Sequence, residues 1–163
     1  MLLGVKVLDL KKLPDERGFF AEAVREDWRG LLEEDRIVQL NLSMSYPGMI
    51  RAWHRHVRGQ VDYFIVVNGA MKICAYDDRE GSETRGQLDE VIASSEKLQV
   101  VRIPGHYWHG TKTIGNEPSL TFYCVNRLYD PKNPDEERRA WNDTTIIDPR
   151  AKQPFDWNRP PHK

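Results

Sequence analysis

Apolar side chains in this chain come in short runs that alternate with polar positions and stop at glycine, proline or asparagine. Runs of this length, rich in β-branched and aromatic residues, are typical of strands. The pattern predicts strands over residues 37–43, 49–56, 98–103 and 120–126. Helical signals are few, and we expect only short helices within residues 25–36 and 135–141.

The clearest element covers residues 62–77, where two β-rich runs flank Asn68-Gly69. Both residues tolerate a positive φ, so the pattern predicts a hairpin. Many short strands with turn signals between them predict an all-β sandwich or barrel. A chain of 163 residues has the size of one domain, so we expect a single domain over residues 1–163, with an extended surface tail from about residue 154.

Composition narrows the choice of partners. The 24 basic and 25 acidic residues leave a net charge of −1, which argues against a general affinity for nucleic acid. No window approaches the roughly 20 apolar residues of a membrane span, and the N-terminus lacks the pattern of a signal peptide. We therefore expect a cytoplasmic protein that does not bind membranes and whose ligand is a small polar molecule.

Four of the five histidines fall in two clusters, one around residues 54–56 and one around residues 106–109. His54 and His56 lie two apart on a predicted strand and share a face, Asp62 follows, and His109 comes after a Pro-Gly turn. This spacing resembles the two cupin motifs, which implies a cupin barrel (a double-stranded β-helix or jelly roll) with a few short helices. Metal-binding cupins hold a divalent ion with three histidines and a carboxylate, so His54, His56, Asp62 and His109 are candidate metal ligands.

A second resemblance covers more of the chain. It rests on segments that keep their order over some 130 residues, namely residues 15–22, 39–43, 51–54, 69–79, 103–110, 123, 129–131 and 141–143. These segments resemble the dTDP-4-dehydrorhamnose 3,5-epimerase family, which is itself a cupin barrel and needs no metal. The resemblance implies an isomerase without a cofactor, in a homodimer that exchanges N-terminal strands.

The resemblance also implies roles for individual residues. His54 closes the segment Arg-Ala-Trp-His and would be the base that removes a proton beside a sugar ketone, while Tyr123 would return a proton to the opposite face. A neutral imidazole that titrates near neutrality suits the first role. The residues implied to bind the nucleotide sugar are Arg17, Glu22, Gln39, Asn41, Arg51, His109 and Tyr129.

The chain departs from the family where the chemistry is concentrated. Asp62 stands at the position of a lysine that stabilises the enolate, and His56 at that of a glutamine. The aspartate that orients the base has no clear match, and Asp148 or Asp156 would have to substitute. A bound metal that polarises the ketone as a Lewis acid would take over the role of the lysine.

Three functions follow. The favoured one is an isomerase that abstracts a proton beside the ketone of a dTDP-4-keto-6-deoxy sugar or a related nucleotide sugar. The alternatives are a metal-dependent cupin enzyme, either an oxygenase or a sugar isomerase, and a non-catalytic cupin that binds a sugar nucleotide. The barrel itself does not decide among them.

Overall fold

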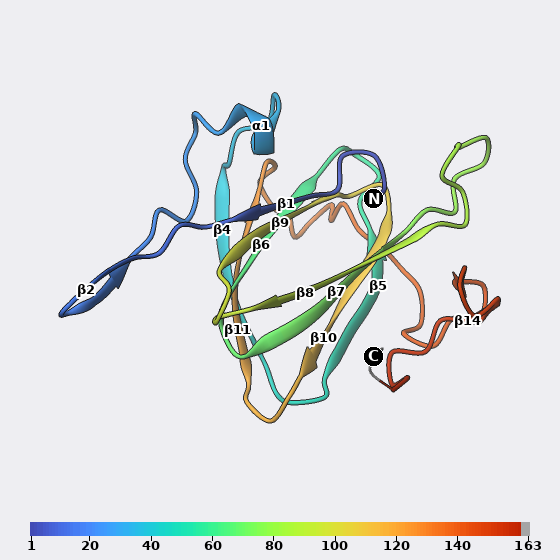
Figure 1. Cartoon of the computed structure of the whole chain (residues 1–163). Helices are drawn as coiled ribbons and strands as arrows, with labels where there is room; N and C mark the ends of the chain where they lie inside the picture. Colours follow the sequence, from blue (N-terminus) through green and yellow to red (C-terminus); the bar gives the residue numbers. More distant parts are fainter. Residues whose placement is uncertain (161–163) are drawn as a thin grey trace.

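Two five-stranded antiparallel sheets face each other and form the barrel (Figure 1). The computed structural model describes residues 1–160. The first sheet has the order β1 (Lys6–Asp9), β9 (Gln99–Pro104), β6 (Val61–Asn68), β11 (Ser119–Val125), β4 (Gln39–Ser45). The second has the order β12 (Glu137–Arg138), β5 (Ile50–Arg55), β10 (Trp108–Ile114), β7 (Ala70–Tyr76), β8 (Leu88–Ser94). This is the predicted all-β cupin barrel, and the predicted strands correspond to β4, β5, β9 and β11.

The predicted hairpin over residues 62–77 is wrong, although both of its strands exist. β6 pairs with β9 and β11, whereas β7 pairs with β8 and β10. The turn at Asn68-Gly69 therefore carries the chain from one sheet to the other. Gly69 has a φ of 68°, and a Cβ there would lie 2.6 Å from the carbonyl oxygen of Pro118, so no larger residue fits. Asn68-Gly69 does form a tight turn, but β6 and β7 pair with strands that are distant in the sequence and not with each other.

Of the two predicted short helices, the one within residues 25–36 is confirmed and the one within residues 135–141 is wrong. Within residues 25–36 only α1 (Arg29–Leu32) is helical, and Gly30 weakens any longer helix. Residues 135–141 contain β12 instead of a helix. The backbone groups of Arg139 and Trp53 exchange hydrogen bonds of 2.9 and 3.1 Å, so the free edge of β5 outweighs the local preference for a helix.

β6 is covered on both faces, which explains why its residues 61–66 are buried without alternation. Phe64 and Val66 belong to the core inside the barrel, and Ile65 packs on the outer side with Leu32 of α1. Part of the outer side of the second sheet is covered by the C-terminal segment, which packs on Trp53, Cys74 and Trp108.

That segment corrects the expected surface tail, as far as residue 160. The strands β13 (Ile147–Asp148) and β14 (Gln153–Pro154) pair, and the chain then buries Phe155 and Trp157 against Trp53. The ring centroids of Trp53 and Trp157 lie 4.8 Å apart. Residues 161–163 of the predicted tail lie outside the described residues. Two aromatic rings with apolar surface to bury outweighed the proline-rich composition.

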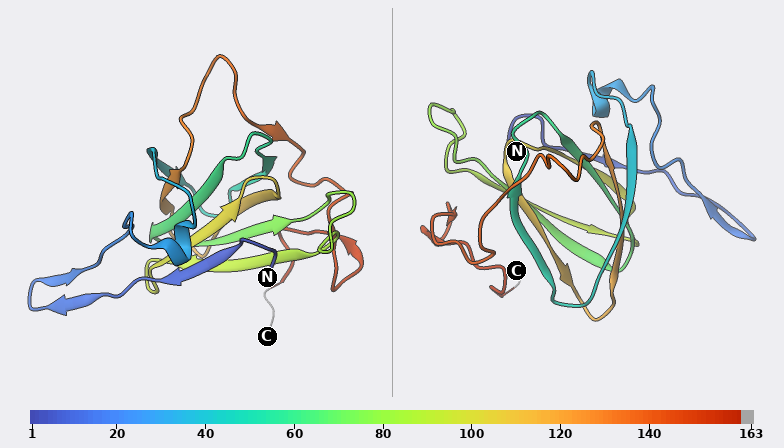
Figure 2. Two further views of the ribbon diagram at one scale, coloured as in Figure 1. Left: turned by 90° about the horizontal axis from the view of Figure 1, so that it is seen from above. Right: turned by 180° about the vertical axis from the view of Figure 1, so that it is seen from behind.

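A short hairpin extends away from the barrel as an arm (Figures 1 and 2). It consists of β2 (Leu13–Asp15) and β3 (Gly18–Phe20), and Phe19 and Phe20 at its end are 55% and 64% exposed. Among residues 1–160, no helix combines the length and the apolar character needed to cross a bilayer.

Candidate functional site

A cavity of about 1200 Å³ opens between the two sheets at one end of the barrel. Side chains from β5 on one sheet and from β4, β6 and β11 on the other form its walls. The loop of residues 126–136, which stands out from the barrel in Figure 2, forms part of its mouth. The cavity brings together most of the predicted site residues, namely Gln39, Asn41, Arg51, His54, His56, Asp62, Tyr123 and Tyr129.

Three predicted residues lie elsewhere. His109 is fully buried behind the cavity wall, where its ring contacts Asp62 and His54. Arg17 lies in the turn of the arm, where it pairs with Asp15 at 2.6 Å. Glu22 follows the arm and pairs with Arg25 at 2.6 Å. Neither Arg17 nor Glu22 lines the cavity of its own chain.

His54 and Tyr123 face the cavity from opposite sheets. His54 lies on β5, opposite His109 in the β-ladder, and Tyr123 lies on β11, where its ring stacks on Phe64 with 6.1 Å between centroids. Burial lowers the pKa of His54 well below its usual value, and the nearby His109 adds to that shift. Burial raises the pKa of Tyr123. At neutral pH the imidazole of His54 is therefore uncharged and the phenol of Tyr123 keeps its proton.

The carboxylate of Asp62 lies at the centre of a buried cluster. Its Oδ2 lies 2.9 Å from Nε2 of His109 and 3.3 Å from Nε2 of His56. Its Oδ1 accepts a hydrogen bond of 2.8 Å from the amide of Gln60. Burial alone would raise the pKa of Asp62, but hydrogen bonds to the two histidines outweigh it and hold that pKa below the usual range. Asp62 is therefore an anion at neutral pH.

Backbone contacts position this cluster. The N–H of His56 donates to the carbonyl of Gly105 at 2.6 Å, and the N–H of Gly105 donates to the carbonyl of Gln60 at 2.9 Å. A Cβ at Gly105 would lie 2.3 Å from that same Gln60 oxygen and 2.8 Å from Cβ of His56. The Pro-Gly turn thus needs glycine because the two segments approach so closely.

No sequence pattern indicated a role for Asp135, which lies in a charged run predicted to be helical. Its backbone carbonyl accepts a hydrogen bond from Nδ1 of His56. Its carboxylate accepts the backbone N–H groups of Val57 and Arg58 at 2.9 and 3.0 Å. The contact joins residues 79 positions apart, and no local pattern signals such a pairing.

Neither aspartate suggested as the partner of the base takes that role. Asp148 forms an ion pair with Arg159, and Asp156 accepts the backbone N–H of Asn158, both in the C-terminal segment. Within residues 1–160 the ring nitrogens of His54 make no hydrogen bond, and the ring of His109 lies 4.1 Å away between centroids.

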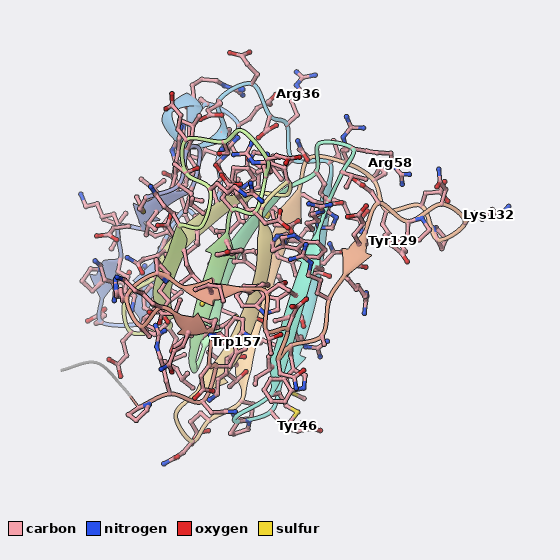
Figure 3. The ribbon with its side chains drawn as sticks, turned by 90° about the vertical axis from the view of Figure 1, so that its right-hand side faces the viewer. Arg36, Tyr46, Arg58, Tyr129, Lys132 and Trp157 are labelled. Carbon is pink, nitrogen blue, oxygen red and sulfur yellow. The ribbon has the colours of Figure 1, made fainter. Side chains whose placement is uncertain are left out.

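Guanidinium groups gather at the mouth of the cavity. Arg51, Arg58, Arg127 and Arg138 all line it. Nε of Arg51 donates to Oγ of Ser45 at 2.8 Å, and Arg58 donates to the side chain of Asn133 at 3.1 Å. Figure 3 shows Arg58 and Tyr129 at the same end of the barrel. Arginine binds phosphate oxygens in pairs, so this mouth suits an anionic, phosphorylated ligand.

A closed antiparallel barrel with a polar cavity, histidines on its inner wall and a cationic mouth defines a cupin-type protein that handles a small anionic molecule. The family model described as dTDP-4-dehydrorhamnose 3,5-epimerase matches residues 1–149. The chain belongs to this family of isomerases, as its sequence motifs implied.

Relatives support the assignment over the whole chain. A probable low-salt glycan biosynthesis epimerase, Agl13 of Haloferax volcanii, is 43% identical over 97% of this chain and 96% of its own length. The spore coat polysaccharide biosynthesis protein SpsL of Bacillus subtilis is 39% identical over 97% of both chains. Among solved structures, the epimerase RmlC of Legionella pneumophila, in complex with dTDP-4-keto-L-rhamnose, superposes with a TM-score of 0.79 at 31% identity. That match covers 88% of this chain and 76% of the other.

Proposed function

We propose that the chain epimerises a dTDP-4-keto-6-deoxy sugar, or a closely related keto-sugar nucleotide, at a carbon beside the ketone. The observation that carries this proposal is the placement of His54 and Tyr123 on opposing sheets around one cavity. A sugar ring held between them presents one face to the base and the other to the acid.

The chemistry needs only these groups and the acidity of the substrate. A proton beside a ketone is acidic because the electron pair of the broken C–H bond spreads onto the carbonyl oxygen. The neutral imidazole of His54 takes that proton, and the enolate forms. The hydroxyl of Tyr123 then gives its proton to the same carbon from the far side, the carbonyl re-forms, and the configuration is inverted. Proton exchange with water restores both side chains, and no organic cofactor takes part.

The nucleotide end of the substrate fits the mouth of the cavity. Arg51 and the neighbouring guanidinium groups suit a diphosphate, and Gln39, Asn41 and Tyr129 line the wall beside them. Nε2 of Gln39 donates to Asn41 at 2.7 Å, and its Oε1 accepts the backbone N–H of Tyr129 at 2.9 Å. This linked polar surface suits the amide-like edge of a pyrimidine base.

We further propose that the working form is a homodimer. The outer face of β4 exposes a stripe of apolar side chains, with Leu40, Leu42 and Met44 between 46% and 61% exposed. Such a stripe on an edge strand invites a second copy. If the arms are exchanged, Arg17 and Glu22 of one copy approach the cavity of the other, which accounts for their distance from their own.

Incubation with dTDP-4-keto-6-deoxyglucose in deuterated water tests the proposal. Mass spectrometry should show one or two deuterium atoms entering the sugar with the wild-type chain, and none above background with His54→Asn. The matched control is His106→Asn, because His106 is exposed, lies outside the cavity and should leave the exchange unchanged. A non-catalytic binding protein would bind the nucleotide sugar and leave its mass unaltered.

A further inference from the structure

Two imidazoles point at one oxygen atom in the buried cluster. Nε2 of His109 and Nε2 of His56 lie 2.9 and 3.3 Å from Oδ2 of Asp62. All three residues are 7% exposed or less. Since proteins seldom bury a carboxylate and two imidazoles together without a specific use, the orientation of the rings indicates what the cluster holds.

The outer nitrogens of both rings are fixed by backbone carbonyls. Nδ1 of His109 lies 2.8 Å from the carbonyl oxygen of Tyr107, and Nδ1 of His56 contacts the carbonyl oxygen of Asp135. A carbonyl oxygen only accepts hydrogen bonds, so each Nδ1 carries a hydrogen. Without an ion, hydrogens on the inner Nε2 atoms bond to Asp62; an ion that displaces these protons would meet one Nε2 lone pair from each ring. This is how proteins anchor histidines that bind metals, and the hydrogen bond from Gln60 to the other oxygen of Asp62 anchors the carboxylate in the same way.

We propose that His56, Asp62 and His109 bind a divalent transition-metal ion at the floor of the cavity. Ligand atoms about 2.1 Å from an ion and at right angles to one another lie about 3.0 Å apart, close to the 2.9 and 3.3 Å observed here. Two imidazoles and one carboxylate suit iron, zinc, nickel or manganese, and they leave other positions on the ion open.

His54 stands beside this site but differs from its three neighbours. A ring nitrogen of His54 lies within 4.8 Å of the three other ligand atoms. Yet the ring has no hydrogen bond within residues 1–160 that would fix its tautomer. The site therefore has three protein ligands instead of the four in the sequence motif, and His54 stays free to act as the base.

The ion would also supply a group that the proposed epimerase reaction needs, and this part of the inference rests on that proposed function. The family resemblance implies that Asp62 stands at the position of a lysine, and a carboxylate alone would repel the negative charge that develops on the ketone oxygen. A divalent ion bound there would make the net charge of the cluster positive and so stabilise the negative charge of an enolate. Asp62 in place of a lysine and His56 in place of a glutamine are then explained together, because both substitutions introduce ligands for the same ion.

Metal analysis of the full chain, purified without a histidine tag or chelator, tests the site independently of catalysis. We expect about one equivalent of a divalent transition metal per chain, as for a structural or catalytic site. Stripping with EDTA and adding Zn²⁺ alone at about a hundredfold its dissociation constant should raise the melting temperature by about 5 °C or more. Asp62→Asn and His56→Gln should lose the metal, whereas His54→Asn and the control His106→Asn should keep it.

Several outcomes overturn the proposal. A wild-type chain that stays metal-free and unshifted in melting temperature after incubation with Zn²⁺, Mn²⁺, Fe²⁺, Co²⁺ and Ni²⁺ would refute it. Loss of the metal in His54→Asn, with the fold intact by circular dichroism, would refute the three-ligand set. If Asp62→Asn fails to fold, the visible absorption spectrum of the wild type loaded with Co²⁺ tests the site instead: bands of protein-bound Co²⁺ support it, and the spectrum of free Co²⁺ refutes it.

Failure of the ion and failure of the epimerase are distinguishable. If a chain freed of metal by a chelator exchanges deuterium into the keto sugar at the full rate, the ion has no role in the reaction and the epimerase proposal stands. If the chain binds the ion stoichiometrically but never exchanges deuterium, the metal site stands and the proposed epimerase reaction is refuted.

Discussion

Replacing Tyr123 by phenylalanine removes one oxygen atom from the cavity and leaves the ring in place. Within residues 1–160 the Tyr123 hydroxyl makes no hydrogen bond, and its ring keeps the stacking contact with Phe64. No buried polar partner is left unsatisfied, so the free energy of unfolding should change by less than about 0.5 kcal/mol. The melting temperature should accordingly move by no more than about 2 °C.

Catalysis should respond far more strongly than stability. A general acid contributes roughly 10²–10⁴-fold to a rate, which corresponds to about 2.7–5.4 kcal/mol of transition-state stabilisation. Inversion at the ring carbon should slow by that factor in Tyr123→Phe. Exchange of the proton with solvent should persist, because His54 can still remove the proton and return a deuteron to the same face.

Two measurements on one reaction separate these steps. In deuterated water, mass spectrometry follows exchange, and chromatography of the reduced sugars follows inversion. Tyr46→Phe is the control, since Tyr46 is 65% exposed and lies outside the cavity. Inversion by Tyr123→Phe at the wild-type rate would place the acid elsewhere. Loss of exchange together with inversion, in a chain that melts normally, would show that the phenol acts before proton removal.

Three further outcomes follow from the packing. Arg102→Met should destabilise the fold by about 3 kcal/mol in urea titrations, because the half-buried Asp35, now 3.0 Å from the guanidinium, loses its charged partner and keeps only hydrogen bonds from Tyr63 and Asn126; a loss below about 1 kcal/mol would contradict this. Burial alone would raise the pKa of Asp77, but hydrogen bonds from the loop after β7 hold it below its usual range, so this carboxylate stabilises the fold above about pH 4 and loses that effect as the pH falls. The stability advantage of the wild type over Asp77→Asn should therefore shrink from pH 7 to pH 3, and a constant difference would refute the assignment. Leu42→Glu should convert the dimer to monomers in light scattering, while Ile92→Glu, at a similarly exposed apolar position on the other sheet, should not; equal behaviour of the two variants would exclude the β4 interface.

Local patterns predicted where strands lie better than which strands pair. The runs that became β4, β5, β9 and β11 carry their own periodicity, so they were found within two residues. The sheet to which β6 and β7 belong depends on partners far along the chain, which is why Asn68-Gly69 indicated a hairpin that does not exist. β12 and the buried Trp157 were missed for the same reason, because each is held by contacts with β5.

The reactive side chains of the site could be predicted from the sequence, but the residues that hold them in position could not. The spacing of His54, His56 and Asp62 and the family motifs predicted that these side chains share one cavity, and all three line it. Gly105 and Asp135 hold them there through backbone groups, and backbone groups are the same for every sequence. Only the fold shows which of them come together.

The central claim is that a proton leaves one face of a keto sugar at His54 and is replaced on the other face from Tyr123. Proton NMR of dTDP-4-keto-6-deoxyglucose, followed in deuterated water with the wild-type chain, tests it most directly. The claim predicts loss of the proton signal beside the ketone and a product whose ring couplings report inverted configuration at that carbon. Recovery of the substrate with that signal at full intensity, under conditions where the nucleotide sugar is bound, would contradict it.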